Sequence, residues 1–126
     1  MKNLFHPAWV ALCLALFSLL SFSAQAESYS YNGTNPKVVI DVRTAEEFAG
    51  GHVQGAINIP HDQIAEAITS VPGLNKEDSI LLYCRSGHRA GIAKQTLENL
   101  GFKRIQNGGG MDYLAQKLKI CKGASC

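Results

Sequence analysis

Two short runs made almost entirely of apolar residues constrain the fold of this chain more than any other feature of its sequence. They are residues 38–42 (VVIDV) and residues 80–84 (ILLYC), and each places β-branched or bulky side chains at nearly every position. A strand with one face in water would instead alternate apolar and polar residues, whereas strands of parallel sheets are buried on both faces. The two runs therefore predict interior strands that are covered by other elements on both sides.

Segments with helical or turn character separate these strands. Thr44 and Glu47 form a capping box that predicts a short helix, which Gly50 and Gly51 end. Further helices are predicted over residues 62–70, 90–100 and 111–120, and further strands over residues 56–59 and 103–106. This alternation predicts an α/β fold with a small central parallel sheet and helices on both faces.

The N-terminal residues have the pattern of a targeting segment. Lys2 precedes an apolar run over residues 8–22, and Ala24 and Ala26 then form an A-x-A cleavage pattern. The run is shorter than the roughly 20 apolar residues that span a bilayer. We therefore predict that residues 1–26 are a secretory signal peptide, cleaved after Ala26, and that the protein is periplasmic or secreted. An uncleaved N-terminal anchor is the alternative.

The remaining chain divides by composition into three parts. Residues 27–36 are polar and rich in turn-forming residues and are predicted to be a flexible leader, residues 37–120 form the domain, and residues 121–126 form a tail. The tail holds Cys121 and Cys126, for which a disulfide is the simplest prediction in an oxidising compartment. A relay of electrons or sulfur from this pair to Cys84 is the alternative.

Charge and histidine spacing exclude several classes of function. The chain of 126 residues has a formal net charge of +2, and its lysines and arginines are scattered. This pattern does not suit an electrostatic nucleic-acid binder. The histidines lack the spacing of metal ligands, so we predict neither a metal site nor another cofactor. We also expect no membrane contact after signal cleavage, and the sequence leaves the oligomeric state open.

Residues 84–89 (CRSGHR) lie between the predicted central strand and the start of a helix. In parallel sheets, ligands bind beyond the carboxyl ends of the strands, where this segment is expected. Backbone N–H groups of a tight loop, the positive end of the helix dipole and the charges of Arg85 and Arg89 would all favour the thiolate of Cys84. We therefore predict that Cys84 is a nucleophile. The alternative is that Cys84 is a small, buried apolar residue.

Four segments together resemble the rhodanese family of sulfurtransferases, in particular its small, single-domain periplasmic type. The segments are residues 41–43 (DVR), residues 52–60 (HVQGAINIP), the Cys84 loop and residues 107–110 (NGGG). They cover nearly the whole predicted domain, and the combination is much more specific than any one of them.

The resemblance implies a two-step sulfur transfer through Cys84. The thiolate attacks the outer sulfur of a donor such as thiosulfate, which releases sulfite and leaves a persulfide on the enzyme. A small acceptor, cyanide or a thiol, then removes that sulfur. The loop N–H groups and side chains would bind the persulfide and the anionic donor, which makes the expected binding residues Arg85, Ser86, Gly87, His88 and Arg89.

Two other functions remain as alternatives. Cysteine phosphatases and arsenate reductases of similar fold use a C-x5-R loop, whereas Cys84 and Arg89 have the shorter C-x4-R spacing. A non-catalytic rhodanese-fold module would bind sulfur or an anion without transferring it. A dithiol redox protein is disfavoured because the chain has no C-x-x-C motif.

Three further residues are predicted to support the site rather than to catalyse. Asp41 and Arg43, at the end of a strand, are expected to form a structural ion pair or hydrogen-bonded corner. His52 is expected to orient a loop through a hydrogen bond to the backbone. For His88, the sequence leaves open whether it modulates Cys84 or faces solvent.

Overall fold

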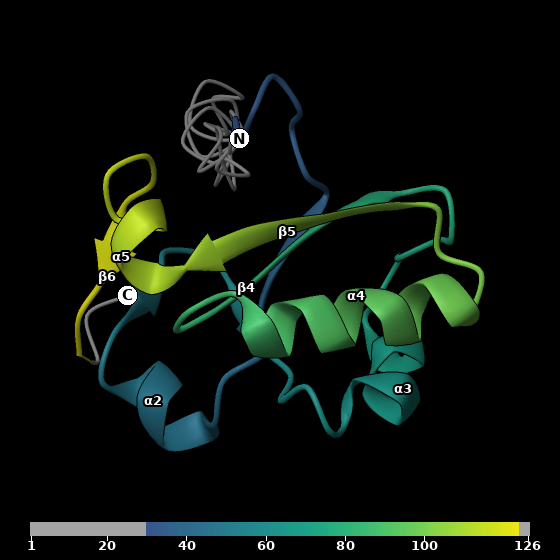
Figure 1. Ribbon diagram of the computed structural model, residues 1–126, viewed down its shortest axis with the longest axis horizontal. Coiled ribbons are helices and arrows are strands. Elements are labelled where there is room, and N and C mark those ends of the chain that lie inside the picture. The colour runs from purple at the N-terminus through teal and green to yellow at the C-terminus, as the bar shows by residue number, and fades with distance from the viewer. Residues whose placement is uncertain (1–29, 124–126) are drawn as a thin grey trace, which may run out of the picture.

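The computed structural model describes residues 30–123, so the predicted signal peptide and Cys126 lie outside the described residues (Figure 1). The elements follow in the order β1 (Val38–Asp41), α2 (Ala45–Ala49), β2 (His52–Val53), β3 (Ile57–Asn58), α3 (Ile64–Ala67), the 3-10 turn η1 (Ile68–Ser70), β4 (Ser79–Cys84), α4 (His88–Asn99), β5 (Arg104–Gly110), α5 (Met111–Leu114) and β6 (Ile120–Cys121).

A parallel sheet of four strands forms the centre of the described chain, in the order β3-β1-β4-β5. The two apolar runs of the sequence form β1 and β4, which are the two interior strands. Helices cover both faces, and this confirms the predicted α/β fold class. The carboxyl ends of the four strands share one edge, where the Cys84 loop begins.

The pleat of the strands sorts their side chains into two cores. Ile40, Ile80 and Leu82 face the side covered by α3 and α4. The alternate residues Leu81 and Tyr83 face the other side, where they pack with residues of α2 and α5. Successive side chains of a strand point to opposite faces, so runs that are apolar throughout fill both cores.

The prediction of the last helix is wrong over most of its length. It was expected over residues 111–120, but α5 ends at Leu114, and Ile120 and Cys121 form β6. This strand pairs with β2 in a separate antiparallel sheet, in the register His52 to Cys121 and Val53 to Ile120. The spacing of Leu114 and Leu118 suits a helix, but pairing with β2 buries Cys121 and gives the backbone of this segment its hydrogen bonds.

Smaller differences concern the other elements. The helix predicted over residues 62–70 is the short α3 followed by η1. The strand predicted over residues 103–106 is longer in the structure, because β5 continues through the glycine-rich residues 107–110. No helix of the described residues is long and apolar enough to cross a membrane.

The described part of the predicted leader lies against the domain. Tyr31 is only 5% exposed and packs in the core beside α5. Its backbone pairs with that of Thr34 in a tight turn, and the Asn35 carbonyl accepts a hydrogen bond from the Ser79 hydroxyl at 3.1 Å. Burial of the Tyr31 ring stabilises this placement of residues 31–35 against the domain.

Candidate active site

Cys84 is the last residue of β4 and has no exposed surface. The backbone N–H of Gly87 donates a hydrogen bond to its Sγ at 2.9 Å. Gly87 has a φ of 93°, a left-handed conformation that favours glycine, and it turns the chain directly into α4 at His88. The sulfur is therefore held at the amino end of a twelve-residue helix, where the helix dipole and a backbone donor both stabilise negative charge.

The other predicted binding residues follow Cys84 in the chain and differ in their exposure. Arg85, Ser86 and His88 are exposed, whereas Gly87 and Arg89 are partly buried. In Figure 1 the loop that carries them projects from the end of β4 toward the region between α2 and α5. The structure thus places these five residues in the loop after β4 and the first turn of α4, with Cys84 buried at the start of this segment.

Arg89 has a carboxylate partner that the sequence analysis missed. Its two terminal nitrogens donate to Glu47 at 2.8 and 3.0 Å, forming a bidentate ion pair between α4 and α2. Hydrogen bonds from Arg89 and from the backbone of Thr44 lower the pKa of Glu47 to about 2. The charge of Arg89 is therefore already paired. Arg85, by contrast, is a cation of the loop that has no ion pair among the described residues.

The glycine-rich end of β5 holds the loop from the other side. The amide of Asn107 donates to the carbonyl of Gly87 at 2.9 Å, and its oxygen accepts from the N–H of Gly109. Gly110 lies so close to the carbonyl of Arg85 that a side chain there would collide with it. Asn107 was not predicted as a site residue, although the glycine-rich segment around it was one of the matching motifs.

Asp41 and Arg43 form a buried ion pair at the end of β1. The carboxylate accepts from the guanidinium at 2.6 to 3.1 Å, and the same guanidinium donates to the carbonyl of Gly51 at 2.7 Å. Next to this pair, the hydroxyl of Tyr83 accepts a hydrogen bond from the backbone N–H of Val53. Burial raises the pKa of Tyr83 well above its usual range, so this hydroxyl stays protonated. These contacts join the ends of β1 and β4 to Gly51 and to β2.

His52 and Cys121 are paired neighbours in the small sheet formed by β2 and β6. The Nδ1 of His52 is 2.9 Å from the carbonyl of Phe48, and its ring stacks on the Phe48 ring at 3.7 Å. Cys121 is buried in β6 and is disulfide-bonded. Cys126, its predicted partner, lies outside the described residues. Cys84 is a free thiol.

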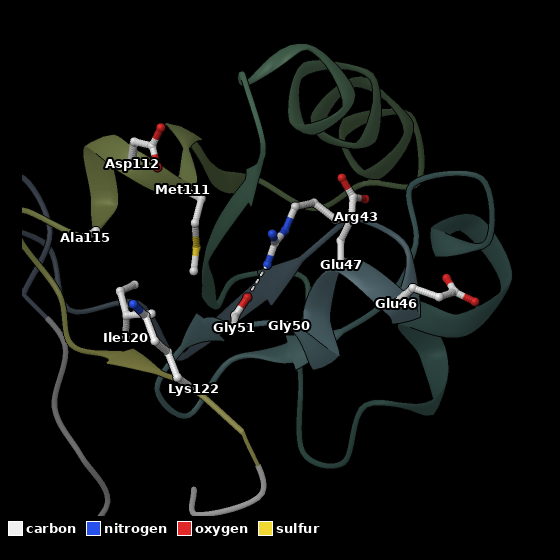
Figure 2. Close-up of a pocket in the computed structure, with 10 residues that line it drawn as sticks. All are labelled: Arg43, Glu46, Glu47, Gly50, Gly51, Met111, Asp112, Ala115, Ile120 and Lys122. Atoms are coloured by element: carbon white, nitrogen blue, oxygen red, sulfur yellow. Dashed lines mark hydrogen bonds between the residues drawn. The ribbon is translucent and has the colours of Figure 1, made fainter.

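A cavity of about 470 Å³ opens beside the loop, between α2 and the α5–β6 segment (Figure 2). Its lining residues are Arg43, Glu46, Glu47, Gly50, Gly51, Met111, Asp112, Ala115, Ile120 and Lys122. Residues 30–123 contain no group of three His, Cys, Asp or Glu side chains that could hold a metal ion.

The fold and the loop define a small α/β domain that holds a cysteine sulfur at the carboxyl edge of a parallel sheet, against a helix amino terminus. The family model of the rhodanese-like domain matches residues 25–116. The chain belongs to this family, which confirms the resemblance drawn from the motifs.

The chain is also similar in sequence and in structure to individual sulfurtransferases and rhodaneses. The thiosulfate sulfurtransferase PspE of Escherichia coli is 43% identical over 77 residues, which cover 60% of this chain and 72% of PspE. A putative mitochondrial thiosulfate sulfurtransferase of Schizosaccharomyces pombe is 36% identical over 85 residues, and the match spans 60% of that protein. A solved rhodanese with anions from E. coli superposes with a TM-score of 0.62 and 40% identity, covering 68% of this chain and 98% of that one.

Proposed function

We propose that this protein is a sulfurtransferase that carries sulfur as a persulfide on Cys84. The observation that carries the proposal is the hydrogen bond from Gly87 N–H to the Cys84 sulfur at the start of α4. A donor and a helix dipole at this position stabilise a thiolate, and they would equally stabilise a terminal persulfide anion. The names of the relatives support the same activity, since PspE is a thiosulfate sulfurtransferase.

The reaction is a transfer in two steps. The Cys84 thiolate attacks the outer sulfur of thiosulfate, an S–S bond forms on Cys84, and sulfite leaves with the electron pair of the broken bond. An acceptor, cyanide or a thiol, then attacks the outer sulfur and regenerates the thiolate. Exposed Arg85 would attract the dianionic donor, and the loop backbone would hold the transferred sulfur. Such a double displacement gives ping-pong kinetics.

Mass spectrometry of the intact protein tests this directly. We expect a gain of about 32 Da, one sulfur atom, after thiosulfate is added, and its loss after cyanide. Cys84→Ser is the control and should gain nothing. A wild-type protein that stays folded, has a free Cys84 and gains no sulfur would contradict the proposal. The same spectrum also reports whether the chain begins after Ala26, as expected for a protein exported to the periplasm.

The complete burial of Cys84 supports a second candidate, a module that binds an anion without transferring sulfur. For catalysis, the groups that bury Cys84 must move to admit the donor. Alkylation by iodoacetamide separates the two candidates. A sulfurtransferase should be modified at Cys84 while it is folded, whereas a closed binding module should resist modification until it unfolds.

A further inference from the structure

The cavity beside the loop shares its walls with the segments that hold Cys84. Glu47 lines the cavity and also binds Arg89 of the loop. Met111 lines it too and directly follows Gly110, whose register partner across the sheet is Cys84. Met111 is therefore one residue beyond the β5 position that pairs with Cys84, and neighbouring strands lie about 5 Å apart.

The side chains that reach into the cavity are apolar and cationic. In Figure 2, Met111 from α5 and Lys122 after β6 point into the same space, with Ile120 beside them. The carboxylates of Glu46 and Asp112 extend away from that space. Arg43 and Glu47 also line it, but their charges are paired with Asp41 and Arg89.

Lys122 is the cation in this cavity that has no fixed partner. The ion pairs among the described residues do not include it. Its stem packs over Gly51, where an added Cβ would lie 3.8 Å from Lys122 Cγ and 3.5 Å from the Cys121 carbonyl. Pairing of β6 with β2 therefore places the ammonium group of Lys122 at the cavity that adjoins the Cys84 loop.

We propose that this cavity is the acceptor site of the sulfur transfer and that it takes a small thiol bearing a carboxylate. Lys122 receives the carboxylate, while Met111 and Ile120 pack against the carbon chain. The inference rests on the proposed sulfurtransferase function and adds the class of acceptor. A cavity of this volume fits a ligand of that size, since pockets for small molecules begin at about 300 Å³.

The chemical step balances without any further reagent. The acceptor thiolate attacks the outer sulfur of the Cys84 persulfide, and a new S–S bond forms between the acceptor and that sulfur. The bond to Cys84 Sγ breaks, and its electron pair returns to Cys84 as the thiolate. The product is the persulfide of the acceptor, and the net oxidation state of the system does not change.

Three thiols that differ in charge test the proposal on the protein preloaded with thiosulfate: 3-mercaptopropionate, 2-mercaptoethanol and cysteamine. The measured quantity is the rate at which the mass of one sulfur is lost. Because the thiols differ in intrinsic reactivity, each rate is taken as the ratio of Lys122→Glu to wild type. We expect about a fivefold fall for 3-mercaptopropionate and no fall for cysteamine, as the screened energy of an exposed charge pair implies.

Two further variants separate charge from structure. Lys76→Glu makes the same change of charge near the amino end of β5, where the Lys76 carbonyl accepts from the Lys103 N–H. The rate of this variant divided by that of wild type should be 1 for all three thiols. Ala115→Phe fills the cavity from an exposed position and should slow all three thiols relative to cyanide. Equal ratios for the three thiols in Lys122→Glu would overturn the acceptor site and leave the sulfurtransferase intact.

A binding experiment covers the case in which no persulfide forms. 3-(Methylthio)propionate has the same carboxylate and chain but cannot accept sulfur. We expect it to shift the NMR signals of Met111 and Lys122 in wild type and to bind more weakly to Lys122→Glu. Absence of such shifts would overturn the site, whereas binding without persulfide formation would contradict only the proposed reaction.

Discussion

Glu47 shows how much one side chain contributes to this site. Its Oε2 accepts from the backbone N–H of Thr44 at 2.9 Å and from Arg89 at 2.8 Å, so the residue caps α2 and anchors the Cys84 loop at once. The capping box alone would predict only the first contact. Through the second contact, Glu47 also holds Arg89 and therefore supports the Cys84 loop.

The lowered pKa of Glu47 predicts a pH dependence of stability. The carboxyl group titrates near 4.5 when unfolded and near 2 when folded, because of its hydrogen bonds from Arg89 and Thr44. A group with a lowered folded pKa stabilises the protein above its unfolded pKa, and this contribution is lost as the pH falls from about 5 to 2. Since 27% of the side chain is exposed, we expect it to be only about 1 kcal/mol.

Urea unfolding at pH 7 and pH 3 measures this effect. The fall in the free energy of unfolding between the two pH values should be smaller in Glu47→Gln than in wild type. Glu98→Gln, which removes an exposed i,i+4 pair with Lys94, should behave as wild type. Identical pH dependence in Glu47→Gln and wild type would show that the pair with Arg89 does not form in solution.

At the scale of elements, the site depends on how closely the end of β5 approaches the β4–α4 loop. Asn107 binds the carbonyl of Gly87, and Gly110 packs directly against Arg85. The two segments meet because β4 and β5 are neighbours in the sheet, with a register shift after Leu82 that sets Gly110 opposite Cys84. The glycines allow this approach, which any side chain would prevent.

Gly110→Ala tests this packing. The added Cβ would collide with the backbone carbonyl of Arg85, so the loop must move. We expect a loss of about 2 kcal/mol in stability, typical of overpacking, and at least a tenfold slower formation of the persulfide. Gly91→Ala is the matched control, because its Cβ meets only the Asn107 amide at 3.6 Å. That variant should be slightly more stable than wild type, as alanine favours a helix.

At the scale of the whole molecule, the buried pair of Asp41 and Arg43 joins segments that no single element connects. Arg43 bonds both Asp41 and the carbonyl of Gly51, and its guanidinium lies 5.8 Å from the centre of the Tyr83 ring. The pair thus links the ends of β1 and β4 to the wall of the cavity.

Asp41→Asn should therefore destabilise the entire domain. Removing one partner leaves Arg43 as an uncompensated buried charge, which typically costs about 3 kcal/mol or more. Urea unfolding measures the change, with the exposed Asp62→Asn as control. We further expect Asp41→Asn combined with Arg43→Met to cost less than the sum of the single changes. A loss below about 1 kcal/mol in Asp41→Asn alone would contradict the assigned role.

The parts of this protein that local sequence determined are those whose signal lies within one short segment of the chain. The strands β1 and β4 follow from their apolar runs, α2 follows from Thr44 and Glu47, and the Cys84 loop follows from residues 84–89. In each case the residue pattern within one short segment specifies the element, although β1 and β4 themselves pair across 42 residues.

Tertiary structure alone decided the contacts between distant segments. Arg89 and Glu47 are 42 residues apart and Asn107 and Gly87 are 20 apart, yet each pair meets at the carboxyl edge of the sheet. The β2–β6 pairing likewise overrode the helical spacing after Met111 and placed Lys122 at the cavity. Such contacts depend on the order and register of the strands, and these are set by packing of the whole chain rather than by the preferences of any one segment.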